Sequence, residues 1–128
     1  LLAEDDEVFN CLLGKILSIT YKVVTVSNGK DAWSWLSEGN LPDLIVSDIK
    51  MPLMNGLELL ENLYLSGSFK SIPVIILSGL DDHRVREKCF DFGAIAYLMK
   101  PFEPQKLLKE VEYPFKRSTI PICYKSVS

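Results

Sequence analysis

The sequence lacks any apolar run near the roughly 20 residues that a membrane span needs, so no transmembrane segment is predicted. It also lacks excess positive charge: 14 basic and 17 acidic residues give a net charge of -3, which argues against binding nucleic acid or anionic membranes by bulk charge. The three cysteines include no Cys-x-x-Cys pair. We therefore expect reduced thiols in a cytoplasmic protein, with Cys11 and Cys89 as small core residues.

What the chain does contain is a regular alternation of short apolar runs and amphipathic stretches within a length that suits one domain. Strands are predicted at 1–3, 21–26, 44–48, 72–77 and 94–98, and helices at 7–19, 30–38, 56–66, 81–92 and 104–112. Because the strands are continuously apolar, they indicate a five-stranded parallel sheet with helices on both faces, an α/β architecture. Pro114 is expected to end the last helix, so we predict a domain over 1–113 and a tail or linker over 114–128; truncation of the chain before an output domain is one explanation for this tail.

Polar side chains follow four of the five predicted strands. They are Glu4, Asp5 and Asp6 after the first strand, Asp48 at the end of the third, Ser78 after the fourth and Lys100 after the fifth. Each has an ordinary alternative, since acids cap helices, hydroxyls occur in loops and lysines are usually solvated. However, the carboxyl ends of parallel strands meet at one edge, where open α/β sheets place their sites.

Clustered carboxylates repel one another unless a cation neutralises them, and oxygen ligands of this kind suit Mg²⁺. A carboxylate in such a site can attack phosphorus and form an aspartyl phosphate. A lysine ammonium and a hydroxyl can stabilise the phosphoryl oxygens. The pattern therefore predicts metal-assisted phosphoryl transfer onto an aspartate.

At this point the chain resembles the receiver domain of bacterial two-component response regulators, the chemotaxis-regulator-like kind, from Leu1 to about Glu112. The markers are Glu4-Asp5-Asp6, the stretch from Asp48 to Gly56 (DIKMPLMNG), Ser78-Gly79, Tyr97 and Lys100-Pro101, in order and at the family's intervals. The resemblance implies a flavodoxin-like doubly wound sheet with strand order 2-1-3-4-5. It also implies that the Lys100-Pro101 peptide bond is cis.

The resemblance further implies roles for single residues. Asp48 would be the phosphoacceptor, and Asp5 would bind Mg²⁺ directly while Glu4 binds it through water. If the family's acid pair aligns one position later in this chain, Asp6 becomes one of the two metal-binding acids. The Lys50 carbonyl would complete the protein ligands.

Three more residues complete the implied machinery. Lys100 would pair with the phosphoryl group, and Ser78 would turn towards it. Tyr97 would be the switch aromatic, whose ring moves inward with that hydroxyl.

The implied function is a phosphorylation-dependent signalling switch rather than an enzyme. A sensor histidine kinase or a phosphotransfer protein would donate the phosphoryl group, and an output domain or downstream protein would bind the face of the fourth helix, fifth strand and fifth helix. On that face lie Arg84, Lys88, Tyr97 and Lys106. The resemblance also allows a homodimer of the phosphorylated form, and it implies no direct nucleic-acid binding by this domain.

Two rival functions are weighed against the switch. A haloacid-dehalogenase-like phosphatase needs a second aspartate two positions after the nucleophile, where this chain has Lys50. A receiver-like binding module that never carries phosphate is the other, and the intact acid pair, acceptor and lysine argue against it. Lys50 and Leu80 occupy positions that control water access in the family, so we also predict slow loss of the phosphoryl group.

Overall fold

The computed structural model describes residues 1–79, 81–116 and 126–127. The strands are β1 (Leu2–Ala3), β2 (Lys22–Val23), β3 (Thr25–Val26), β4 (Ile45–Asp48), β5 (Val74–Ser78), β6 (Ala94–Met99) and β7 (Ser126–Val127). The helices are α1 (Glu7–Ser18), α2 (Gly29–Ser37), α3 (Gly56–Leu65), α4 (His83–Asp91) and α5 (Pro104–Lys116). Leu80, residues 117–125 and Ser128 lie outside the described part, so the prediction for Leu80 and most of the predicted tail have no structural outcome.

The main sheet has five parallel strands in the order β3-β1-β4-β5-β6. Counted along the chain with β3 as the second strand, this is the predicted order 2-1-3-4-5, and the flavodoxin-like α/β fold is confirmed. The winding direction reverses between β1 and β4, so the carboxyl ends of these two strands flank the position where such folds place their sites.

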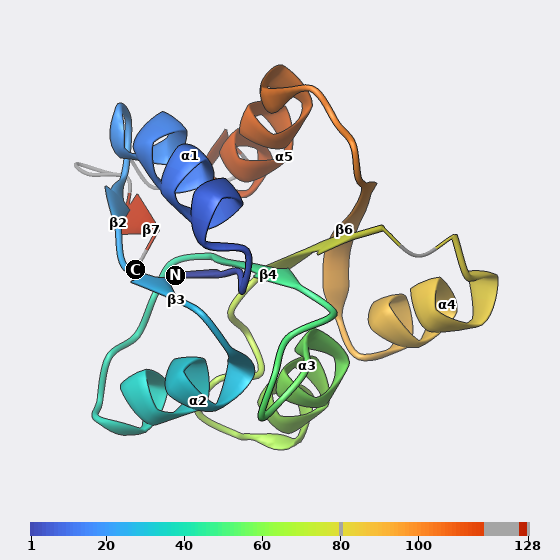
Figure 1. Cartoon of the computed structure of the whole chain (residues 1–128). Helices are drawn as coiled ribbons and strands as arrows, with labels where there is room; N and C mark the ends of the chain where they lie inside the picture. The colour runs from blue at the N-terminus through green and yellow to red at the C-terminus, as the bar shows by residue number, and fades with distance from the viewer. Residues whose placement is uncertain (80, 117–125, 128) are drawn as a thin grey trace.

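Helices cover both faces of the sheet, α1 and α5 on one and α2, α3 and α4 on the other (Figure 1). Neighbouring strand residues point to opposite faces, as the two-residue period of a strand requires. On β4, Ile45 packs in the cluster beneath α2 and α3, whereas Val46 packs in the cluster beneath α1 and α5. Burial on both faces explains why the strands are continuously apolar.

The predicted second strand is interrupted. Its second half, β3, pairs with β1, whereas its first half, β2, pairs with β7 in a separate two-stranded sheet. Val24 lies between the halves, and its carbonyl accepts a hydrogen bond from the N–H of Leu2 at 2.9 Å. The two halves form their ladders with different partners, which no local sequence pattern reveals.

Two further expectations are wrong. The last helix does not end at Pro114 but contains it and continues to Lys116. Phe115 stacks on Tyr21 with ring centroids 5.6 Å apart, and this contact holds the final turn against the domain despite the proline. Cys11 is exposed rather than in the core, because α1 turns Leu13 and Leu17 inward instead.

The loop after β4 is tightly packed around the end of that strand. The N–H of Gly56 donates to the carbonyl of Ile49 at 2.8 Å, and a side chain at Gly56 would start within 2.0 Å of the Asp48 carbonyl oxygen. Asn55 and Glu58 form a reciprocal capping box that begins α3. The end of β4 is therefore fixed from both the strand and the following helix.

Candidate functional site

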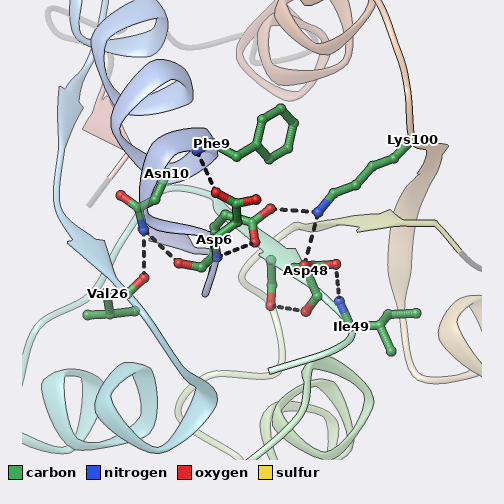
Figure 2. Close-up of polar contacts among 9 residues, drawn as sticks. Asp6, Phe9, Asn10, Val26, Asp48, Ile49 and Lys100 are labelled. Carbon is green, nitrogen blue, oxygen red and sulfur yellow. Dashed lines mark hydrogen bonds and ion pairs between the residues drawn. The ribbon is translucent and has the colours of Figure 1, made fainter. Parts of the chain in front are cut away.

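Asp48 is the last residue of β4, and its carboxylate is held by two hydrogen bonds. Its Oδ1 accepts from the backbone N–H of Ile49 at 2.8 Å, and its Oδ2 accepts from Nζ of Lys100 at 3.0 Å (Figure 2). The residue is only 6 % exposed. A buried acid with both oxygens bound by donors is in a defined orientation, with one oxygen directed at a cation.

Glu4 and Asp5 follow β1, the strand beside β4 in the sheet. Glu4 is fully buried, and its carboxylate accepts hydrogen bonds from Nζ of Lys100 at 2.7 Å and from the N–H of Asp6 at 3.2 Å. Burial raises the pKa of Glu4 to about 7, and the hydrogen bond from Lys100 opposes that rise. Asp5, by contrast, is exposed.

Three carboxylates meet at this edge of the sheet. Glu4, Asp5 and Asp48 each offer an oxygen atom, and these atoms all lie within 4.8 Å of one another. Hard carboxylate oxygens at this spacing fit the coordination preferences of Mg²⁺, which commonly takes one or two carboxylates and keeps several waters. The residues present therefore fit the predicted metal.

Lys100, at the end of β6, joins the two buried acids. Burial alone would lower the pKa of Lys100, but its hydrogen bonds to Glu4 and Asp48 together raise it, so the ammonium form is favoured. The ring of Phe9 lies beneath the ammonium, with Nζ 4.8 Å from the ring centroid. The Lys100-Pro101 peptide bond is cis, as the resemblance implied.

Asp6 has a different role from its two neighbours. Its side chain caps α1 by accepting the N–H of Phe9 at 3.1 Å, and it is not part of the carboxylate cluster. This geometry favours the Glu4–Asp5 register over the alternative that uses Asp6.

Ser78 and Tyr97 lie together on the neighbouring strands β5 and β6. Both are buried, at 1 % and 8 % exposure. Burial raises the pKa of Tyr97, and a hydrogen bond with Ser78 opposes that rise. Lys100 is tied to the same strand end, because its backbone N–H donates to the carbonyl of Ser78 at 2.8 Å.

Lys50, the remaining predicted ligand, follows β4 by two positions. It is exposed and lines a surface hollow together with Asp5, Asn55 and Val85. Lys50 and Asp5, the acid that the resemblance assigns to the metal, thus line the same hollow.

Sequence reasoning missed two residues in the first turns of α1, Phe9 and Asn10. Phe9 was not singled out, but its ring contacts the Lys100 ammonium and, edge to face at 5.9 Å, the ring of Phe102. Asn10 was not singled out, yet its amide joins two strand ends (Figure 2). The only sign of this role in the sequence was that Asn10 is a polar residue in the first turns of the helix that follows Glu4-Asp5-Asp6.

Comparisons with known proteins identify the family to which the chain is similar. The family model of the response regulator receiver domain matches residues 1–112. The chain is 35% identical over 121 residues to the probable transcriptional regulator ycf29 of Pyropia yezoensis, covering 94% of this chain and 54% of that protein. The chain thus spans about half the length of that relative, and 7% of a hybrid signal transduction histidine kinase of Dictyostelium discoideum to which it is 34% identical.

Solved structures show the same fold. The receiver domain of a signal transduction histidine kinase from Syntrophus aciditrophicus has a TM-score of 0.82 and 32% identity, covering 96% of both chains. The receiver domain of the sensor histidine kinase PA1611 from Pseudomonas aeruginosa has a TM-score of 0.78 and 26% identity, covering 90% of this chain and 94% of that one. That second structure has a magnesium ion coordinated in its active site cleft.

Proposed function

Because this chain belongs to the response regulator receiver domain family, we propose that it is a phosphorylation-dependent signalling switch whose phosphoacceptor is Asp48. The observation that carries the proposal is the pairing of Asp48 with Lys100 at 3.0 Å beside a cluster of three carboxylates. This combination supplies a nucleophile, a fixed positive charge and oxygen ligands for a cation in one place.

The proposed reaction is an in-line transfer onto an oxygen of Asp48. That oxygen attacks the phosphorus of the donor, and a new P–O bond forms. In a phosphohistidine donor the P–N bond breaks, and the leaving imidazole keeps the electron pair and takes up a proton. Lys100, already within hydrogen-bond distance of Asp48, stabilises the added negative charge.

Glu4, Asp5, Asp48 and the backbone carbonyl of Lys50 would hold Mg²⁺. When bound, the ion neutralises the carboxylates and the phosphoryl oxygens during transfer. The fully buried position of Glu4 keeps its carboxylate fixed beside Asp48 and Lys100. This chain's own contribution is thus to hold the acceptor, the lysine and the acids in one arrangement.

The response to phosphorylation would pass through Ser78 and Tyr97. Their hydrogen bond, on adjacent strands next to Lys100, supports a coupling in which Ser78 turns to the phosphoryl group and Tyr97 repacks. The surface of α4, β6 and α5, with Arg84, Lys88 and Lys106 exposed, would then change its affinity for partners.

The proposed donor is a sensor histidine kinase or phosphotransfer protein in the cytoplasm. A downstream protein, an output domain or a second phosphorylated copy would bind the changed surface. Every helix among the described residues falls short of the length and apolar character that a bilayer crossing requires. The exposed Lys50, which lines the same hollow as Asp5, supports slow loss of the phosphoryl group, a property best measured as a half-life after donor removal.

The test is intact mass spectrometry after incubation with a small phosphodonor and Mg²⁺. Wild type should gain one phosphoryl group, and Asp48→Asn should gain none. Asp6→Asn is the matched control, because it also removes one carboxylate but from the helix cap outside the cluster. An adduct that survives Asp48→Asn, or an unlabelled wild type, refutes the proposal.

A further inference from the structure

We propose that Asn10 is a positioning residue that orients the acid pair Glu4–Asp5 and thereby sets the affinity of the site for Mg²⁺. This inference rests on the proposed function, since it concerns the same site. Asn10 lies in the first turns of α1 and is partly buried. Its Nδ2 donates to the carbonyl of Glu4 at 2.9 Å and to the carbonyl of Val26 at 3.0 Å (Figure 2).

The two acceptors specify an amide at this position. Both are backbone carbonyl oxygens, which cannot donate, so the nitrogen rather than the oxygen of the Asn10 side chain faces them. One Nδ2 carries two hydrogens and can serve both carbonyls at once. A serine or threonine hydroxyl has one hydrogen, and an ionised aspartate has none, so neither could make both bonds from this place.

The carbonyl of Glu4 belongs to the peptide plane that joins Glu4 to Asp5. A hydrogen bond to that oxygen therefore fixes the rotation of the plane, and with it the directions in which the two acidic side chains leave the backbone. One of these acids is fully buried and the other exposed. Their oxygens nevertheless lie within 4.8 Å of each other and of an oxygen of Asp48, which requires this backbone segment to be held.

The second bond connects this segment to the neighbouring strand. β1 has only two residues, and beyond it the N–H of Glu4 donates to the carbonyl of Val26 at 3.1 Å. Asn10 donates to the same carbonyl, so α1, the end of β1 and the end of β3 meet at one side chain. The acid pair is thus fixed to the sheet edge and to the helix that follows it.

Residues that hydrogen-bond to metal ligands without touching the metal commonly change metal affinity by about 10–100-fold when they are replaced. We expect Asn10→Leu, which keeps the size of the side chain but has no donor, to weaken Mg²⁺ binding about tenfold. Asn10→Ala should also weaken Mg²⁺ binding about tenfold, and it introduces no larger apolar group. Ser18→Ala is the matched control, because it deletes another side-chain hydrogen bond to backbone on the same helix, from Ser18 Oγ to the Gly14 carbonyl at 2.6 Å.

The test measures the dissociation constant for Mg²⁺ by calorimetry and the thermal midpoint in EDTA for all four proteins. The inference predicts weaker Mg²⁺ binding in both Asn10 variants and wild-type binding in Ser18→Ala, and it predicts that saturating Mg²⁺ restores the rate at which Asp48 is labelled. If an Asn10 variant loses thermal stability but binds Mg²⁺ as wild type does, the residue is merely structural and the inference is wrong. If wild type itself does not bind Mg²⁺, the proposed function fails instead. Should Asn10→Leu not fold, Asn10→Ala decides.

Discussion

Nζ of Lys100 lies 3.0 Å from Oδ2 of Asp48, although 52 positions separate the two residues in the chain. Each residue stands at the carboxyl end of a parallel strand, Asp48 on β4 and Lys100 directly after β6, with β5 between them. The long side chain of lysine spans the intervening strand. This reach explains why a site of this kind can be assembled from strands that are not neighbours.

Glu4→Gln should remove a pH-dependent loss of stability from the metal-free protein. Burial raises the pKa of Glu4 from its ordinary value of 4.5 to about 7 in the folded chain, so the folded state holds this proton more tightly. Stability therefore falls as the pH rises from about 4.5 to 7 and stays lower above 7. In EDTA, urea unfolding should show Glu4→Gln more stable than wild type by about 1–2 kcal/mol at pH 8, with no advantage near pH 4.5.

Glu7→Gln is the control for that comparison, because Glu7 is an exposed acid in the first turn of α1. It should not reproduce the gain at pH 8. A Glu4→Gln protein that is less stable than wild type at pH 8 would show that the ion pair with Lys100 outweighs the burial of the charge.

Gly56→Ala should disturb the end of β4 directly. The new methyl carbon would lie 2.0 Å from the Asp48 carbonyl oxygen and 2.9 Å from Cα of Ile49, and both are backbone atoms that cannot rotate away. We expect destabilisation of about 3 kcal/mol or more in urea unfolding. Gly67→Ala, where nothing lies within 4 Å, should change stability by less than about 0.5 kcal/mol. Equal effects of the two substitutions would contradict the close packing around Asp48.

The last turn of α5 should contribute to stability even though it follows a proline. A chain ending at Lys116 keeps the stacking of Phe115 on Tyr21, whereas a chain ending at Tyr113 loses it. Because both shortened chains lack residues 117–128, the difference between their stabilities measures the contribution of residues 114–116 alone. We expect the shorter chain to be less stable by about 1–3 kcal/mol in urea unfolding. Identical unfolding curves would show that residues 114–116 do not stabilise the domain.

Much of the fold was predictable because most strands are continuously apolar and four of the five are followed by or end on a polar side chain. The same property made Asp48 and Lys100 predictable, since parallel strands bring their carboxyl ends to one edge. Pro114 and the second strand were not predictable, because local propensity competes there with contacts from distant segments, Tyr21 for the helix and β7 for the strand.

Asn10 shows a further limit of sequence reasoning. Its importance depends on two carbonyl groups, and every residue has a carbonyl, so no residue type in the sequence marks the partners. Cys11, one position on, was misplaced in the core for a related reason. The packing of Leu13 and Leu17 decides which side of α1 faces the sheet. Apolar residues cover a wide part of the helix surface, so the sequence alone does not show which of them face inward.

Asp48 is the proposed phosphoacceptor, and the most direct test is to locate the acyl phosphate itself. Wild type is incubated with a small phosphodonor and Mg²⁺ and then reduced with borohydride, which converts an aspartyl phosphate to homoserine. Peptide mass mapping should find homoserine at position 48 and unchanged aspartate at Asp5 and Asp6. Homoserine at either of those positions, or none in a protein whose intact mass shows the added phosphoryl group, would contradict the assignment of Asp48 as the phosphoacceptor.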